Sequence, residues 1–239
     1  MNTVMIERGE TKMVAHRGVS GLERENTCPA FVAAGVKSYW GIETDVHITA
    51  DEKYVISHDE NLKRCSGVDI VIEQSKFDTI RSIPLLDTDG ETLRTDLFPP
   101  TLDDYIAICR KYGKQAVLEL KNPFPEKHVA GVIDTITQMG WYERTTLISF
   151  CRENLVIARR LCPDLDIEFL AMKCDGDTLD FMKRNRIGAD IFFKEMTPEF
   201  VAAAHEAGLA VNVWTVNEPA DAARLIAMGV DQITTNILE

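Results

Sequence analysis

Apolar and polar positions repeat one pattern along most of this chain. A stretch with helical spacing ends at a glycine, and a short apolar stretch follows. After Thr101, for example, apolar residues recur at spacings of three and four, which is typical of a helix with one buried face. Glycine is favoured just past a helix end because it adopts the left-handed conformation without strain. The glycines at these boundaries are Gly35, Gly113, Gly140, Gly188, Gly208 and Gly229.

Several of the expected helices also carry a recognisable start. Thr101 stands three residues before Asp104, the spacing of a capping box. The pair Thr197-Pro198 and the later Pro219 each place a proline where a first helical turn begins, a position that tolerates its missing N–H. We therefore expect helices to begin at these residues.

The apolar stretches between the helices predict strands over 12–16, 41–48, 115–120, 146–149, 166–170, 189–193, 209–214 and 231–235. Strands that alternate with helices favour parallel pairing through crossover connections. Eight such units fit a closed (β/α)8 TIM barrel of the α/β class. A doubly wound open sheet is the alternative.

One segment interrupts this alternation. Residues 50–100 contain a β-like stretch at 54–57 and a turn at 87–90, but no complete strand–helix unit. We interpret this segment as a small insertion after the second strand, which begins with a hairpin and stands over one end of the barrel. No linker composition divides the chain, so residues 1–239 are expected to form a single domain.

Composition and charge narrow the classes of function. Apolar residues make up 45% of the 239 and charged residues 27%, as in ordinary globular proteins. A net charge of −12 without a run of Lys or Arg argues against nucleic-acid binding and against stable association with anionic membranes. A small anionic substrate stays compatible, because it needs only a local positive patch.

The cysteines and the N-terminal residues indicate the cellular compartment of the protein. The six cysteines form no C-x-x-C pair, which favours reduced thiols in a cytoplasmic protein over a disulfide framework. Residues 1–12 are polar and do not resemble a signal peptide, and no apolar run is long enough to span a membrane. The pattern indicates no particular oligomeric state.

The strand at 41–48 carries the most informative polar residues. Side chains alternate between the faces of a strand, so Glu43, Asp45 and His47 share one face, opposite an apolar one. In the third strand, Glu119 and Lys121 share a face in the same way. Three carboxylates thus converge on adjacent strands, and ligation by oxygen alone suits a hard cation, Mg²⁺, Ca²⁺ or Mn²⁺.

Further polar residues stand at the expected C-terminal ends of strands, where barrels place their active sites. His16 and Arg17 end the first strand, Lys121 follows the third, and His58 follows the β-like stretch of the insertion. A cation, Arg17 and Lys121 together would suit a phosphate group. The two histidines could move protons on and off attacking and leaving oxygens.

These residues lie in motifs that resemble one family, the glycerophosphodiester phosphodiesterases. The motifs are His16-Arg17-Gly18, Glu25-Asn26-Thr27, Gly41-Ile42-Glu43-Thr44-Asp45-Val46, Ser57-His58-Asp59, Leu118-Glu119-Leu120-Lys121, Ser149-Phe150 and Val213-Trp214-Thr215-Val216-Asn217. Their order and spacing cover nearly the whole chain.

The resemblance implies a TIM barrel and a hydrolase that converts a small-molecule glycerophosphodiester to glycerol 3-phosphate and an alcohol, within lipid and glycerol metabolism. It implies metal ligation by Glu43, Asp45 and Glu119 and acid–base catalysis by His16 and His58. It further implies phosphate contacts from Arg17 and Lys121 and a glycerol-facing Trp214. His16 as general base and His58 as general acid is the expected division of roles, with a cyclic phosphate opened afterwards by water.

The chain departs from the usual family pattern at three places, among them Asn236, where aspartate is more common. For Glu25, Asn26 and His47 we favour supporting roles, and a strand-end tryptophan such as Trp214 would by default be a core residue. The rival functions are a phospholipase C or D type of reaction, a barrel that only binds a phosphorylated metabolite, and a sugar-phosphate lyase or isomerase. We rank the phospholipase lower because the insertion is mostly polar, and the binding-only barrel lower because both histidines and all three carboxylates are present. The lyase or isomerase ranks lower because residues 216–219 and 235–237 lack the glycines that a phosphate-binding cup would need.

Overall fold

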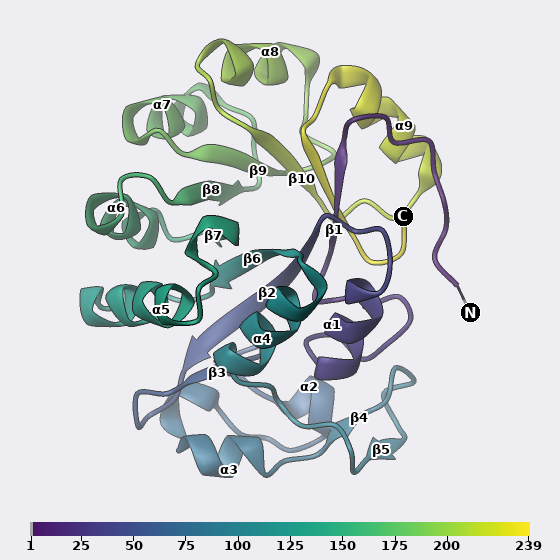
Figure 1. The fold of residues 1–239 in the computed structure, drawn as a ribbon, viewed down its shortest axis with the longest axis vertical. Coiled ribbons are helices and arrows are strands. Elements are labelled where there is room, and N and C mark those ends of the chain that lie inside the picture. Colours follow the sequence, from purple (N-terminus) through teal and green to yellow (C-terminus); the bar gives the residue numbers. More distant parts are fainter. Residues whose placement is uncertain (1) are drawn as a thin grey trace.

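A closed barrel of eight parallel strands forms the centre of the molecule (Figure 1). The computed structural model describes residues 2–239. The barrel strands are β1 (Lys12–Ala15), β2 (Gly41–Ile48), β6 (Gln115–Leu120), β7 (Thr145–Ser149), β8 (Asp166–Ala171), β9 (Gly188–Phe192), β10 (Val211–Trp214) and β11 (Gln232–Thr235). Pairing of β1 with both β11 and β2 closes the ring. The predicted TIM barrel is therefore confirmed, and the open sheet is excluded.

Helices surround this barrel between successive strands (Figure 1). They are α1 (Cys28–Gly35), α4 (Leu102–Tyr112), α5 (Glu126–Gln138), α6 (Arg152–Leu161), α7 (Gly176–Asn185), α8 (Pro198–Glu206) and α9 (Pro219–Met228). The expected starts are present. The Thr101 hydroxyl accepts from Asp104 N at 2.9 Å while the Asp104 carboxylate accepts from Thr101 N at 3.0 Å, which is a complete capping box.

The glycine pattern predicted the helix ends correctly in most cases but not in all. Gly113 and Gly229 cap α4 and α9 in the left-handed conformation, as expected. Gly188 instead opens β9, because Arg186 itself takes the left-handed conformation (φ 53°) and caps α7. Gly35 ends α1 as predicted, but it is the last helical residue and not a left-handed cap, and it lies against the ring of Tyr112. Its lack of a side chain allows α1 to approach α4.

The insertion begins with a hairpin, as predicted, in which β3 (Tyr54–Ile56) pairs antiparallel with the end of β2. The remainder holds α2 (Lys63–Ser66), η1 (Ile72–Gln74), α3 (Phe77–Arg81), β4 (Leu85–Leu86) and β5 (Leu93–Arg94). Its own small core consists of Val55, Leu62, Ile72, Ile80 and Ile83. This core anchors the insertion beside the C-terminal end of β2.

Most of the apolar core lies between the strands and the surrounding helices. Inside the barrel, an apolar cluster that includes Val14 and Val117 is accompanied by buried polar side chains. Among these, Glu168 on β8 accepts a hydrogen bond from Gln232 Nε2 at 2.9 Å. Within residues 2–239, α5 is the longest helix at 13 residues, and no helix qualifies as a membrane span.

The contact of α1 with α4 allows a test of packing. A Cβ atom added to Gly35 would lie 2.5 Å from Tyr112 Cδ2, so Gly35→Ala is expected to lower the free energy of unfolding by about 1–3 kcal/mol. Gly176 in α7 has no atom within 4 Å of the equivalent position, and Gly176→Ala should be neutral or stabilising by up to about 1 kcal/mol. Urea unfolding measures both. Equal stability of the two variants would contradict the packing described for α1.

Burial raises the pKa of Glu168 from 4.5 to about 8. Between these values the unfolded chain ionises this carboxyl while the folded protein keeps it protonated, so stability falls as pH rises from about 4.5 to 8. Glu168→Gln should reduce this slope, and Glu206→Gln, on the exposed surface of α8, should leave it unchanged. The measurement is urea unfolding at several pH values. An unchanged slope in Glu168→Gln would show that Glu168 titrates normally.

Candidate active site

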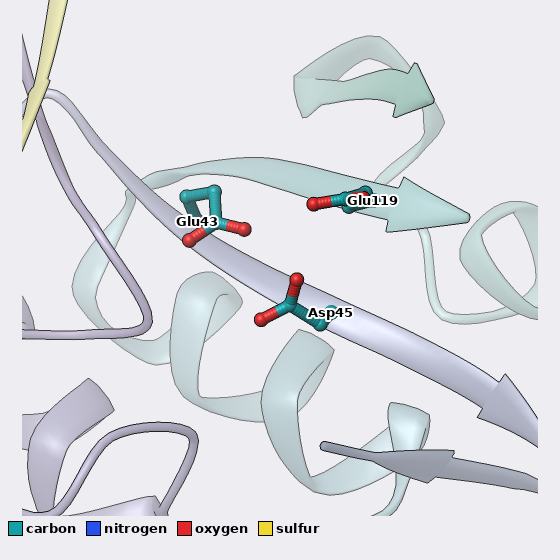
Figure 2. A group of neighbouring side chains, drawn as sticks. All are labelled: Glu43, Asp45 and Glu119. Atoms are coloured by element: carbon teal, nitrogen blue, oxygen red, sulfur yellow. The ribbon is translucent and has the colours of Figure 1, made fainter. Parts of the chain in front are cut away.

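Three carboxylates meet at the C-terminal end of the barrel because of the register between β2 and β6. Asp45 pairs with Glu119, and Glu43 precedes Asp45 by two residues on the same face of β2. One carboxylate oxygen from each residue lies within 4.8 Å of the others (Figure 2). All three side chains are buried, with exposed fractions of 3%, 1% and 6%. The convergence that alternation predicted is therefore present.

Positive and polar groups compensate this buried negative charge. Lys121 Nζ lies 2.9 Å from Glu119 Oε1 and 3.3 Å from Asp45 Oδ1. Arg17 Nε forms an ion pair at 3.5 Å with Asp45 Oδ2, and this oxygen accepts a hydrogen bond from Asn26 Nδ2 at 2.7 Å. Two basic side chains, Arg17 and Lys121, thus face three carboxyl groups. Their positive charge does not balance three ionised carboxylates, so a bound metal cation would bring the cluster closer to neutrality.

The pKa values of the carboxyls diverge for physical reasons. Burial raises the pKa of Glu43, and it raises the pKa of Glu119 to about 8, with the nearby Asp45 adding to both shifts. Burial would also raise the pKa of Asp45, but Lys121 and Arg17 outweigh it and hold this pKa below its usual value. A cation bound among them would favour the ionised form of all three.

The cluster fits a hard divalent cation. Asp45 Oδ1 and Glu119 Oε1 are buried, and the single ammonium group of Lys121 faces both, at 3.3 and 2.9 Å. Buried carboxylate charge is costly unless partners compensate it, and one ammonium group shared by two carboxylates compensates them only in part. Carboxylate oxygens are the ligands that Mg²⁺, Ca²⁺ and Mn²⁺ prefer.

Arg17 reaches the cluster through an unusual turn after β1. Its backbone has a positive φ of 53°, and its N–H donates to Glu43 Oε2 at 2.7 Å. The next residue, Gly18, has φ 78°, and a Cβ there would lie 2.6 Å from the carbonyl carbon of Ala30. Only glycine fits this close approach. The His-Arg-Gly motif is therefore explained by the turn that directs Arg17 into the site.

Each of the two histidines is held at its own Nδ1, but the acceptor differs between them. His16 Nδ1 lies 2.7 Å from Asn236 Oδ1, a neutral amide that also accepts from Ser20. His58 Nδ1 lies 2.6 Å from Asp59 Oδ1, a carboxylate whose pKa is lowered to about 2 despite partial burial, chiefly by Arg64. Both acceptors select the tautomer with the proton on Nδ1, so Nε2 of each ring is left for chemistry.

The predicted site residues line one pocket, apart from Asp45. Its lining comprises His16, Arg17, Glu43, His58, Glu119, Lys121, Ile148, Phe150, Leu170, Asp190, Trp214 and Thr234. Asp45 is 1% exposed and contacts the pocket residues Arg17 and Lys121. A larger cavity of about 260 Å³ opens at the N-terminal ends of the strands, around Glu168 and Gln232. In TIM barrels that end serves stability, and the C-terminal end holds the active site.

Aromatic side chains form one wall of the pocket. The rings of Phe150 and Trp214 meet edge to face with their centroids 5.5 Å apart, and Trp214 Nε1 donates to the carbonyl oxygen of Asp190 at 3.0 Å. Trp214 is thus fixed in orientation while its ring faces the pocket, so it is not simply a core residue. Phe150 is 42% exposed at the rim.

Glu25 and His47 make contacts that fit the supporting roles expected of them, and the structure adds Asp59 and Arg64, which the sequence did not single out. Glu25 accepts from Arg17 Nη1 at 2.9 Å and also binds Arg64 of α2. His47 Nε2 lies 3.2 Å from the carbonyl oxygen of His58 and supports its loop. Asp59 could have been found, because it directly follows His58. No sequence pattern pointed to Arg64, since α2 is four residues long and shows no periodicity.

Comparison with known proteins points to one family. Its profile, described as the glycerophosphoryl diester phosphodiesterase family, matches residues 16–239. A glycerophosphodiester phosphodiesterase of Caldanaerobacter subterraneus is 28% identical over 235 residues, which cover 95% of this chain and 94% of that protein. One of Bacillus subtilis is 28% identical over 249 residues, which cover 93% of this chain and 82% of that protein.

A solved structure supports the same fold. An Oleispira antarctica phosphodiesterase, described in complex with the product sn-glycerol-3-phosphate, superposes with a TM-score of 0.86 at 24% identity, covering 94% of this chain and 92% of the other. The resemblance expected from the motifs is confirmed. With the family profile matching almost the whole barrel, the chain belongs to the glycerophosphoryl diester phosphodiesterase family, whose members are phosphodiester hydrolases.

Proposed function

We propose that this protein hydrolyses glycerophosphodiesters to glycerol 3-phosphate and an alcohol, using a divalent cation and two histidines. The observation that carries the proposal is that the cluster Glu43, Asp45 and Glu119 lies at one pocket together with two basic side chains and two histidines. A phosphodiester needs charge compensation and proton transfer on both sides of phosphorus, and each requirement has a side chain here.

The carboxylates Glu43, Asp45 and Glu119 would hold the cation, Mg²⁺, Ca²⁺ or Mn²⁺. When bound, such a cation withdraws charge from a phosphoryl oxygen and orients substrate oxygens. The buried oxygens of Asp45 and Glu119, which share only the ammonium group of Lys121, support this assignment. Arg17 and Lys121 lie beside the carboxylates and would contact the remaining phosphoryl oxygens.

The partners of the histidines support distinct roles. Burial lowers the pKa of both imidazoles, that of His16 to about 4, but the Asp59 carboxylate at His58 Nδ1 opposes this shift at His58, whereas the Asn236 amide at His16 is neutral. His58 is therefore the better general acid, which protonates the departing alcohol. His16 remains neutral and, through Nε2, would act as general base on the neighbouring glycerol hydroxyl. The roles would exchange when water opens the resulting cyclic phosphate.

The remaining parts of the proposal concern the substrate and its setting. Trp214 would line the glycerol side of the pocket, where its ring meets Phe150. The substrate is a small molecule, and the six free cysteines support a cytoplasmic setting, in which thiols stay reduced.

Cation binding can be measured without activity. Isothermal titration calorimetry of metal-stripped protein with Mn²⁺ should give one site, and Glu119→Gln should weaken it by about 10-fold or more. Glu168→Gln is the matched control, since Glu168 is also a buried carboxyl of the barrel interior but lies outside the cluster. Equal weakening by both substitutions would argue against a cation at Glu43, Asp45 and Glu119.

Activity tests the division of roles. Release of glycerol 3-phosphate from glycerophosphocholine should fall by about 10²–10⁴-fold in both His16→Asn and His58→Asn. With a p-nitrophenyl ester of glycerol 3-phosphate, whose leaving group needs little protonation, kcat/KM of His58→Asn should recover while that of His16→Asn should not. Recovery in His16→Asn instead would reverse the assigned roles, and no product from the unmodified protein would refute the proposed function.

A further inference from the structure

Arg64, on the short helix α2 of the insertion, binds two carboxylates that each support a residue of the pocket. Its Nη1 and Nη2 donate to Glu25 Oε2 and Oε1 at 2.9 and 2.8 Å. Its Nε donates to Asp59 Oδ2 at 2.6 Å. One guanidinium thus holds two segments that are far apart in the chain.

Each of these carboxylates also contacts a residue that lines the pocket. Glu25 Oε1 also accepts from Arg17 Nη1 at 2.9 Å, so Glu25 lies between two arginines. Asp59 Oδ1 lies 2.6 Å from His58 Nδ1. Two chains of charge-assisted hydrogen bonds therefore start at Arg64, one ending at Arg17 and the other at His58.

The contacts of Arg64 are better defined than those of an ordinary surface ion pair. Exposed single pairs contribute little, but bidentate arginine–carboxylate pairs within a network are better defined. The Arg64 side chain is 45% exposed, whereas Glu25 is 17% exposed, and Arg64 and Arg17 together lower the pKa of Glu25 to about 2 against the effect of burial. Glu25 is therefore held as a carboxylate between its partners.

We propose that Arg64 is a positioning residue through which the insertion fixes both Arg17 and His58. This inference rests on the proposed function, since it concerns the phosphate contact of Arg17 and the acid role of His58. Without Arg64, Asp59 is free to turn away from His58 Nδ1, and the ring loses its fixed tautomer and orientation. Glu25 keeps only Arg17 as its cationic partner, so the direction of Arg17 is less restricted.

The planar fork of arginine is essential to this role. Three N–H groups that point in fixed directions reach Glu25 and Asp59 at once, and a lysine ammonium on a flexible stem cannot reproduce that arrangement. The neighbouring Lys63 provides a matched control. It belongs to the same helix but pairs with Asp69 at 3.1 Å, away from the pocket.

The experiment compares Arg64→Met, Arg64→Lys and Lys63→Met with the unmodified protein. Thermal unfolding first establishes that each variant is folded. Two quantities are then measured: the inhibition constant of glycerol 3-phosphate, which reports phosphate binding, and kcat/KM for glycerophosphocholine and for the p-nitrophenyl ester.

For Arg64→Met we expect weaker inhibition by glycerol 3-phosphate and a loss of kcat/KM on glycerophosphocholine of about 10- to 100-fold, the size typical for removing a hydrogen-bonded support of a site residue. The loss should be several-fold smaller on the p-nitrophenyl ester, because that leaving group depends little on His58. Arg64→Lys should fall between, and Lys63→Met should match the unmodified protein.

A double-substitution cycle separates the two chains of contacts. In an Asp59→Asn background, Arg64→Met should no longer change the preference between the two leaving groups, because the route to His58 is already broken. The weaker inhibition by glycerol 3-phosphate should persist, since it arises through Glu25.

The outcomes distinguish this inference from the proposed function. An unmodified protein that releases no glycerol 3-phosphate would overturn the proposed function, and this inference with it. An active protein in which Arg64→Met is folded and keeps both its inhibition constant and its leaving-group preference would overturn the inference alone. Full activity of Arg64→Lys would show that charge suffices without the arginine fork, which also contradicts the proposal.

Discussion

The burial of three carboxylates on two neighbouring strands is the constraint on which the rest of the site depends. Each buried charge costs several kcal/mol unless it is compensated, and Glu43, Asp45 and Glu119 lie within one small cluster. Arg17 and Lys121 supply part of the compensation, and the turn that directs Arg17 inward requires Gly18. A pocket with this charge pattern is suited to a cation and a phosphate together.

The insertion supplies the part of the site that the barrel strands do not. The barrel supplies the carboxylates and His16, while the segment after β3 supplies His58 together with Asp59. Because β3 pairs with the end of β2, the insertion is fixed to the same strand that carries two of the carboxylates. The distance between the two histidines is therefore set by both the barrel and the insertion, and Arg64 adds a contact between the insertion and the loop after β1.

Strand alternation and helix caps were enough to predict the barrel and the carboxylate cluster, because both depend on local periodicity and on parallel register. The sequence was misleading at Gly188, where Arg186 took the left-handed position that glycine usually fills. Within the insertion the sequence did not predict the helices α2 and α3, because they have four and five residues, too few for a periodic pattern. Arg64 was missed because α2 has no periodic pattern and because Glu25, 39 residues away in the chain, is brought to it only by tertiary structure.

A crystal structure of the protein with Mn²⁺ and glycerol 3-phosphate would show whether Glu43, Asp45 and Glu119 hold a cation. Anomalous scattering locates the metal without reference to activity. We expect one anomalous peak among Glu43, Asp45 and Glu119, with the phosphate in contact with Arg17 and Lys121. If glycerol 3-phosphate fills the pocket but no anomalous peak lies at these carboxylates, or if the peak lies elsewhere in the barrel, the three carboxylates do not form the cation site.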